Sequence, residues 1–306
     1  MEENKQPILS ICVPTYNREK YLRRLLDSIV FQKEFIDTND VEVVISDNAS
    51  TDSTKELVNE YVKKYWNKIK FFQNKENIWM RWNLYKVPSL WTWKYLWWMW
   101  SDQKLNSNGI WIMLKWLKKC EVKTVVVSNS EYDSLSLIFN GFSDFSTYIW
   151  QHKKDFLEIE GWLLTFMSYC CMSREYFLET ITFLKSIMDE EKIINNYFNF
   201  SLIRYSQLYW NGSILYIRNN VFIPVSDAES SWTINRKIVK DLSFIINYIE
   251  NNYFVSKLAR KVLENIKRIW VIAYITLPLK KLCKLFHLEK VYSKLGWLYR
   301  IYLHKI

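Results

Sequence analysis

Apolar and polar positions alternate in blocks along the first part of the chain, in an order that predicts strands followed by helices. Ile8 to Pro14 is a short apolar run, and Arg18 to Gln32 carries apolar residues at helical spacing. The order repeats at Val41 to Ser46, an apolar run before a segment in which Ser50 or Thr51 is placed to cap a helix. A repeated strand and helix unit predicts an α/β fold, with a mostly parallel sheet sandwiched by helices.

The same alternation continues toward residue 128. Further strands are expected at Ile69 to Gln73, Tyr95 to Trp100 and Thr124 to Ser128, and further helices at Asn83 to Leu90 and Ile110 to Lys118. We therefore divide the chain into an α/β domain over residues 1–225 and a helical extension over residues 226–306.

Polar residues follow each predicted strand, where the ligands of parallel sheets bind. They form four groups: Thr15 to Arg18, Asp47 to Ser50, Asn74 to Asn77 and Ser101 to Gln103. The chain contains neither GxGxxG nor GxxxxGK[ST], so neither a dinucleotide-binding fingerprint nor a P-loop is predicted.

Four stretches in this order resemble the motifs of one enzyme family. They read PILSICVPTYNREKYLRRLLDSI, VEVVISDNASTDSTKELV, NKENIWMRWNLYK and WKYLWWMWSDQKL. The chain resembles the family 2 glycosyltransferases, most closely the abequosyltransferase-like branch that acts on bacterial surface polysaccharides, over about Pro7 to Leu117. The resemblance implies a GT-A fold that binds a nucleotide-sugar donor over residues 1–225.

The resemblance also implies roles for the strand-end residues. Pro14, Thr15, Tyr16 and Asn17 would line the pocket for the nucleotide base, Asp47 would bind the base or ribose, and Asn83, Ser101 and Asp102 would complete the donor site. Other readings stay open: Asn17 and Asn83 equally suit turns and caps, and strand-end aspartates often cap helices.

Asp102 would also meet a divalent cation in the acidic motif of the family. Mg²⁺ or Mn²⁺ suits carboxylate oxygens and the two charges of a leaving nucleoside diphosphate. The usual second acidic position holds Gln103, a poorer ligand, so either the metal affinity is low or Asp102 alone holds the metal. Displacement by an acceptor hydroxyl would invert the anomeric carbon. The alternative is a degenerate, non-catalytic homologue that binds nucleotide or glycan.

The sequence assigns no catalytic base. The acidic candidates are ordinary helix-surface residues by pattern: Asp155, Glu158, Glu160, Glu175, Asp189, Glu190 and Glu191.

Tryptophan is abundant and glycine scarce in this chain. It has 16 Trp and 5 Gly, whereas ordinary usage of about 7% glycine would give roughly 21. Trp79, Trp93 and Trp100 stand where the family motifs have glycine, a residue used where the backbone turns tightly against a ligand. Some bacterial lineages read the UGA codon as glycine. Our hypothesis is that many of these tryptophans correspond to UGA codons of such a lineage that were translated under the wrong genetic code.

The net charge of +10 is concentrated at the end of the chain, where residues 256–306 contain twelve Lys and Arg and two acidic residues. Their interleaving with apolar residues predicts an amphipathic helix on an anionic membrane surface, which would suit a lipid-linked glycan acceptor; solvated lysines on a packed helix pair are the alternative. Nucleic-acid binding is disfavoured because the charge is confined to this segment. The polar start of the chain carries no signal-peptide pattern, so we expect a cytoplasmic protein, peripheral on the inner face of the membrane.

Overall fold

The computed structural model describes residues 7–90, 94–119, 121, 124–128, 147–150, 167–187, 189, 214–218 and 221–223. The chain divides into two compact units, Met1–Glu229 and Ser230–Ile306, and every described residue belongs to the first. The predicted basic extension therefore lies outside the described residues. In the part of the chain that is described, no helix has the length and apolar character needed to cross a membrane.

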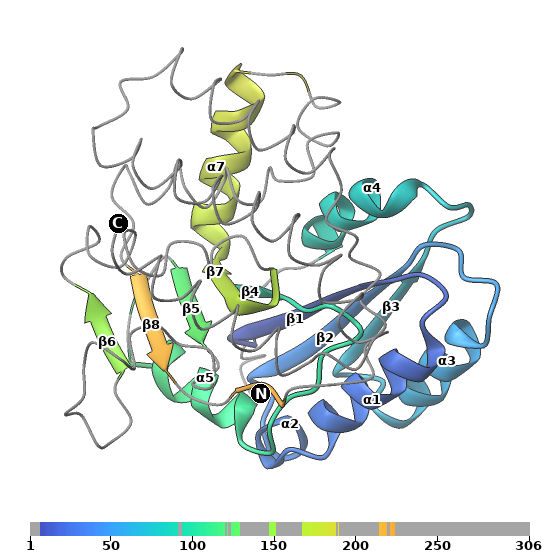
Figure 1. The fold of residues 1–306 in the computed structure, drawn as a ribbon, viewed down its shortest axis with the longest axis horizontal. Coiled ribbons are helices and arrows are strands. Elements are labelled where there is room, and N and C mark those ends of the chain that lie inside the picture. The colour runs from blue at the N-terminus through green and yellow to red at the C-terminus, as the bar shows by residue number, and fades with distance from the viewer. Residues whose placement is uncertain are drawn as a thin grey trace, which may run out of the picture. The chain divides into compact units, whose positions relative to one another are not determined.

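The described strands form one sheet in the order β3-β2-β1-β4-β7-β5-β8-β6 (Figure 1). The strands are β1 (Leu9–Thr15), β2 (Val41–Asp47), β3 (Ile69–Gln73), β4 (Tyr95–Trp98), β5 (Thr124–Ser128), β6 (Thr147–Trp150), β7 (Cys170–Ser173) and β8 (Ile214–Arg218). The helices are α1 (Glu19–Val30), α2 (Lys33–Asp37), α3 (Thr54–Lys64), α4 (Trp79–Lys86), α5 (Gly109–Leu117) and α7 (Arg174–Ile187), with short 3-10 turns η1 (Val87–Leu90) and η5 (Met167–Tyr169).

The part of the sheet formed by β1, β2, β3 and β4 is parallel, as predicted. β1 pairs with β2 and with β4, β2 pairs with β3, and all three pairings are parallel. Every residue of β1 and β2 is buried, as expected for strands covered on both faces. Figure 1 shows α1, α2, α3 and α5 on one side of the sheet and α4 and α7 on the other. The predicted α/β architecture is therefore confirmed.

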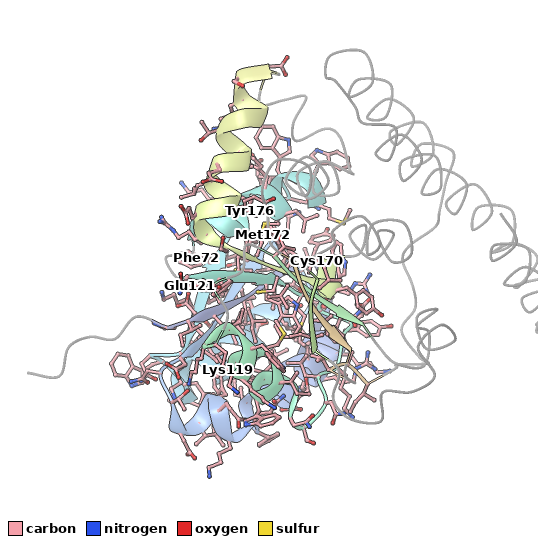
Figure 2. All side chains as sticks on the ribbon, turned by 90° about the vertical axis from the view of Figure 1, so that its left-hand side faces the viewer. Phe72, Lys119, Glu121, Cys170, Met172 and Tyr176 are labelled. Atoms are coloured by element: carbon pink, nitrogen blue, oxygen red, sulfur yellow. The ribbon has the colours of Figure 1, made fainter. Side chains whose placement is uncertain are left out.

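Antiparallel pairing enters the sheet at β7, which the sequence did not predict. β7 lies between β4 and β5 and is antiparallel to both. Its sequence, CCMS, is four residues long and has no β-branched residue, so it lacks the composition typical of a strand. Cys170, Cys171 and Met172 are buried, and Figure 2 shows α7 rising from the sheet after Met172, with Tyr176 near the base of the helix.

Packing of α1 on the sheet follows the helical spacing of its apolar residues. Leu22, Leu25, Leu26 and Ile29 are fully buried, and they join one core cluster with Leu57 and other residues of α3. Burying each such side chain stabilises the fold by roughly 1.5–3 kcal/mol. The two helices therefore cover the β1–β2 pair as a unit.

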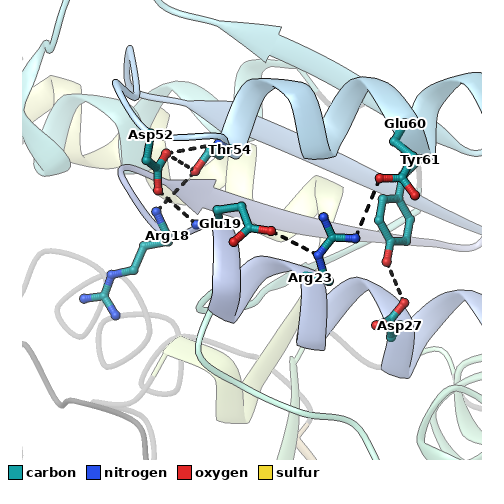
Figure 3. A network of polar contacts seen from close by, with 8 residues as sticks. All are labelled: Arg18, Glu19, Arg23, Asp27, Asp52, Thr54, Glu60 and Tyr61. Atoms are coloured by element: carbon teal, nitrogen blue, oxygen red, sulfur yellow. Dashed lines mark hydrogen bonds and ion pairs between the residues drawn. The ribbon is translucent and has the colours of Figure 1, made fainter.

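Polar contacts tie the start of α1 to the start of α3 (Figure 3). The carboxylate of Asp52 accepts hydrogen bonds from Glu19 N (3.1 Å), Thr54 N (3.0 Å) and Thr54 Oγ1 (2.5 Å). Further along, Tyr61 OH donates to Asp27 Oδ1 at 2.5 Å. The two helices are thus fixed to each other at both ends of their contact.

The predicted cap of α3 was wrong. The N-cap residue is Ser53, so the helix begins later than a cap at Ser50 or Thr51 would place it. The reason is that Ser50 is bonded to Asp47 and the backbone N–H of Thr51 to Asn17. Asp52 supplies the acceptor for Thr54 instead.

We predict that Asp52→Ala lowers the stability of the full chain by about 1 kcal/mol near neutral pH, because it removes a shared helix-start acceptor. Partial burial alone raises the pKa of Asp52, but hydrogen bonds from Thr54 and Glu19 outweigh it, and the net shift is downward. A lowered carboxyl pKa gives stability that is present above the unfolded value of about 4 and is lost as the pH falls through the folded value.

Urea denaturation at a series of pH values measures this effect. The difference between the wild type and Asp52→Ala should shrink below about pH 4. The exposed Glu76→Ala should show no such trend. A difference that is constant with pH would contradict the role of the charged carboxylate.

Candidate functional site

The ends of three neighbouring strands form one row at the carboxyl edge of the sheet. Thr15 of β1 is in register with Asp47 of β2, and Asp47 is in register with Gln73 of β3. Pro14 lies one step earlier, opposite Ser46. Because β4 is paired with β1 only as far as Cys12, the end of β1 extends beyond its neighbour. This edge is where ligands of such sheets bind.

Asp47 lies at the centre of this row and is fully buried. Its carboxylate accepts hydrogen bonds from Gln73 Nε2 at 2.8 Å, from the backbone N–H of Ser50 at 3.2 Å and from Ser50 Oγ. Buried charges are tolerated when they are hydrogen-bonded in this way. Gln73 was missed from the sequence because it is the last residue of an apolar run, and only its position at a strand end marks it.

The loops after β1 and β2 bind each other. Asn17 Oδ1 accepts a hydrogen bond from Thr51 N at 2.7 Å, and Asn17 N donates to Ser50 Oγ at 2.8 Å. Asn17 and Ala49 both have positive φ, 50° and 62°, so each loop turns sharply as it leaves its strand. Tyr16, in the loop after β1, is 42% exposed. The structure therefore brings Thr15, Tyr16, Asn17 and Asp47 together as predicted.

Asn83 takes part in a buried amide network beside this row. It donates to Ser46 O at 2.9 Å and accepts from Ser46 Oγ at 2.6 Å and Asn74 Nδ2 at 3.1 Å. Asn74 in turn donates to Asn48 Oδ1 at 3.1 Å, and Asn48 donates to Asn77 Oδ1 at 2.7 Å. With 2% of its surface exposed, Asn83 joins α4 to the end of β2, and its predicted contact with the donor stays a prediction.

Asp102 lies beyond β4, the strand adjacent to β1. Ser101 is buried, and Gln103 N donates to Trp100 O at 3.1 Å, which closes a turn around Asp102. The backbone carbonyl of Asp102 accepts a hydrogen bond from Arg24 of α1 at 3.0 Å. Asp102 is thus fixed to α1 through its backbone.

Two buried side-chain oxygens at this edge, Thr15 Oγ1 and Asp102 Oδ1, make no hydrogen bond within the described residues. Buried polar atoms are normally satisfied, so such atoms indicate a missing partner. For a carboxylate oxygen that partner can be a hard cation, and Mg²⁺ is commonly bound by one or two carboxylates together with substrate phosphates. Asp102 therefore fits a divalent cation shared with a diphosphate, although no cluster of three metal-ligating side chains occurs among the residues described.

The backbone at Trp79 gives a physical reason to expect glycine there. Trp79 has φ 67° at the start of α4, and its side chain is 77% exposed. A residue with a β-carbon is strained in this region, and glycine is not. Trp100 is not among the residues with positive φ, and Trp93 lies outside the described residues. Trp97 and Trp98 are fully buried, as expected for core residues of β4.

Two of the acidic candidates for a catalytic base lie within the described residues, and the other five lie outside them. Glu175, in the first turn of α7, and Asp189 are exposed. The five outside the described residues are Asp155, Glu158, Glu160, Glu190 and Glu191.

Comparison with known sequences places the chain in a family of transferases. The profile of glycosyl transferase family 2 matches residues 10–182, which is more than half of the chain. The chain belongs to glycosyl transferase family 2.

A stretch of 71 residues is 44% identical to abequosyltransferase RfbV of Salmonella typhimurium and covers 23% of this chain and 21% of that protein. A stretch of 73 residues is 37% identical to the uncharacterized glycosyltransferase MG025 of Mycoplasma genitalium, over 24% of this chain and 23% of that protein. These matches span less than a quarter of the length of either relative.

Solved structures share the fold at low sequence identity. TarS 1–349 of S. aureus superposes with a TM-score of 0.57 at 18% identity, covering 84% of this chain and 69% of that one. The mannosyltransferase PcManGT from Pyrobaculum calidifontis, in complex with GDP-Man and Mn²⁺, superposes with a TM-score of 0.57 at 14% identity over 98% of this chain and 86% of that one. The GT-A fold implied by the sequence motifs is therefore confirmed.

We predict that Trp79→Gly is more stable than Trp79→Ala by about 1 kcal/mol, because alanine keeps the β-carbon that strains a positive φ. At the equally exposed Trp66, which is 78% exposed and does not have positive φ, alanine should be the more stable by about 0.5 kcal/mol. Urea denaturation of the four variants measures both differences. Equal stability of the glycine and alanine variants at position 79 would refute the strain, and mass spectrometry of the native protein reads the residue directly.

Proposed function

We propose that this chain is an inverting glycosyltransferase, which moves a sugar from a nucleoside-diphosphate donor to a lipid-linked glycan acceptor. The observation that carries the donor assignment is a pair of buried oxygens, on Thr15 and Asp102 at the carboxyl edge of the parallel strands, that have no partner in the described part of the chain. Membership of glycosyl transferase family 2 supports the reaction class. Structures with the same fold are described in complex with UDP, with UDP-GlcNAc and with GDP-Man and Mn²⁺.

The nucleoside part of the donor is assigned to the row at the ends of β1 and β2. Thr15 offers a hydroxyl without a partner among the described residues, and Tyr16 offers an exposed ring for contact with the base. Asp47 is an acceptor for base or ribose hydroxyl and N–H groups. To bind them it exchanges one of its present donors, Ser50 or Gln73, so binding rearranges these contacts.

Asp102 is assigned to the ribose and to a divalent cation, Mg²⁺ or Mn²⁺. When bound, the cation neutralises charge on the diphosphate leaving group. The side chain of Gln103 is neutral, so Asp102 provides the one carboxylate of this motif that binds the cation.

Transfer itself is a single displacement at the anomeric carbon. The acceptor hydroxyl oxygen forms the new bond as the bond from the anomeric carbon to the diphosphate oxygen breaks, and the leaving diphosphate keeps that electron pair. The hydroxyl proton passes to a base that the described residues do not identify. Attack opposite to the leaving group inverts the configuration of the sugar. A lipid-linked acceptor would suit binding of the basic segment, residues 256–306, to an anionic membrane surface.

We predict that a sugar conjugate of UDP, GDP, CDP or dTDP stabilises the full chain when it is added together with Mn²⁺. At a hundredfold excess over its Kd, it should raise the melting temperature by about 5 °C. Asp102→Asn should abolish the part of this rise that requires Mn²⁺. Asp47→Asn should reduce the rise with and without Mn²⁺, because it weakens contact with the nucleoside.

Asp37→Asn is the matched control, since Asp37 is exposed and precedes β2 at the opposite end of that strand from Asp47. It should behave as the wild type. If no nucleotide sugar of the panel stabilises the wild type, the assignment of the donor site is wrong. If stabilisation occurs but no sugar is transferred or hydrolysed, the chain is a binding protein with the family fold, which is the alternative that Gln103 raises.

A further inference from the structure

The segment that carries Asp102 is held along its length by one helix. Residues 102–108 join β4 to α5, and within the described residues their one β-bridge joins Leu105 to Phe222. Arg24, Ser28 and Gln32 are spaced four residues apart at α1 and just after its end, so they lie on one face. Each of the three is hydrogen-bonded to the backbone of this segment or of the first turn of α5.

The contacts run in sequence order. Arg24 donates to Asp102 O at 3.0 Å, and Ser28 Oγ accepts from Leu105 N at 3.0 Å. Gln32 donates to Asn106 O at 3.0 Å and accepts from Ile110 N at 2.8 Å. The last contact caps α5, whose own N-cap residue makes no side-chain cap bond. Gln32 is 3% exposed, so this contact is protected from competing water.

Residues 221–223 bind the same segment. Asn106 N donates to Val221 O and Ile223 N donates to Lys104 O, both at 2.8 Å. A β-carbon at Gly109 would lie 2.9 Å from Val221 O, so the close approach depends on glycine. The segment is therefore held both by the polar face of α1 and by residues 221–223.

This arrangement bears on Asp102 because no described donor orients its buried Oδ1. The position of the carboxylate then depends on the backbone that carries it, and that backbone is fixed by Arg24 at Asp102 itself. We propose that Arg24, assisted by Ser28 and Gln32, is a positioning residue that sets the metal affinity of Asp102. The inference rests on the proposed donor and metal site.

Titration of the full chain with UDP, GDP, CDP and dTDP, each in Mn²⁺ and in EDTA, tests this role. Arg24→Ala should weaken the apparent Mn²⁺ affinity, measured with the diphosphate that the wild type binds, by about tenfold, as loss of an outer contact to a metal ligand does. Affinity in EDTA should be unchanged, because the contacts at Thr15 and Asp47 remain. Arg24→Lys keeps the charge but not the planar donor group, and should also lose affinity.

Arg23→Ala is the matched control. It removes the same charge from the adjacent position, where the side chain is bonded to Glu19 at 3.0 Å and faces Glu60, and it should match the wild type. Ser28→Ala should shift Mn²⁺ affinity in the same direction as Arg24→Ala. The inference is overturned if Arg24→Ala keeps wild-type Mn²⁺ affinity, if it loses affinity equally in Mn²⁺ and EDTA, or if Arg23→Ala has the same effect. If the wild type binds none of the four diphosphates, the proposed function fails and the positioning role fails with it.

Discussion

The parallel ladder between β1 and β2 is the constraint on which the rest of the structure depends. Seven pairs hold Leu9 to Val41 and Thr15 to Asp47 in register, and every residue in them is buried. A slip of one residue would turn each side chain to the opposite face of the sheet. The register therefore fixes which apolar groups face α1 and α3, and it also brings Thr15 and Asp47 to the same edge. Stability and site geometry are set by the same pairing.

At that edge, most polar groups are satisfied by one another. Asp47 is bonded to Ser50 and Gln73, and Asn17 ties the loop after β1 to the loop after β2. The contacts of Asn17 hold the two loops in place before any ligand arrives, which reduces the entropy lost on binding. Against this background the oxygens of Thr15 and Asp102 stand out, because they are buried and have no hydrogen-bond partner among the described residues. Under the proposed function, the contrast between satisfied and unsatisfied groups directs the donor to this edge.

Much of the parallel half of the sheet could be predicted from the sequence, because buried parallel strands read as apolar runs and α1 has a clear helical period. The strand end at Asp47 and the helix over Leu57 follow from the same pattern. Other features depend on contacts distant in the sequence. The short strand at Cys170–Ser173 gains its pairing from both neighbours rather than from its composition. The burial of Asn83 and the contact of Arg24 with Asp102 O, 78 residues away, involve side chains whose type alone suggests only turns and solvent. Sequence motifs suggested the candidate residues of the site, whereas tertiary contacts decide which of those side chains are engaged in the scaffold.

Hydrogen exchange, followed by mass spectrometry, tests the central claim most directly, because it locates binding without assuming which donor is used. The full chain is compared with and without a mixture of nucleoside diphosphates and Mn²⁺. The account predicts slower exchange in residues 15–18, 47–52 and 101–106, the loops at the carboxyl ends of β1, β2 and β4, with little change at the opposite edge near residues 37–40. No protection in these loops, or protection confined to another part of the chain, would contradict it.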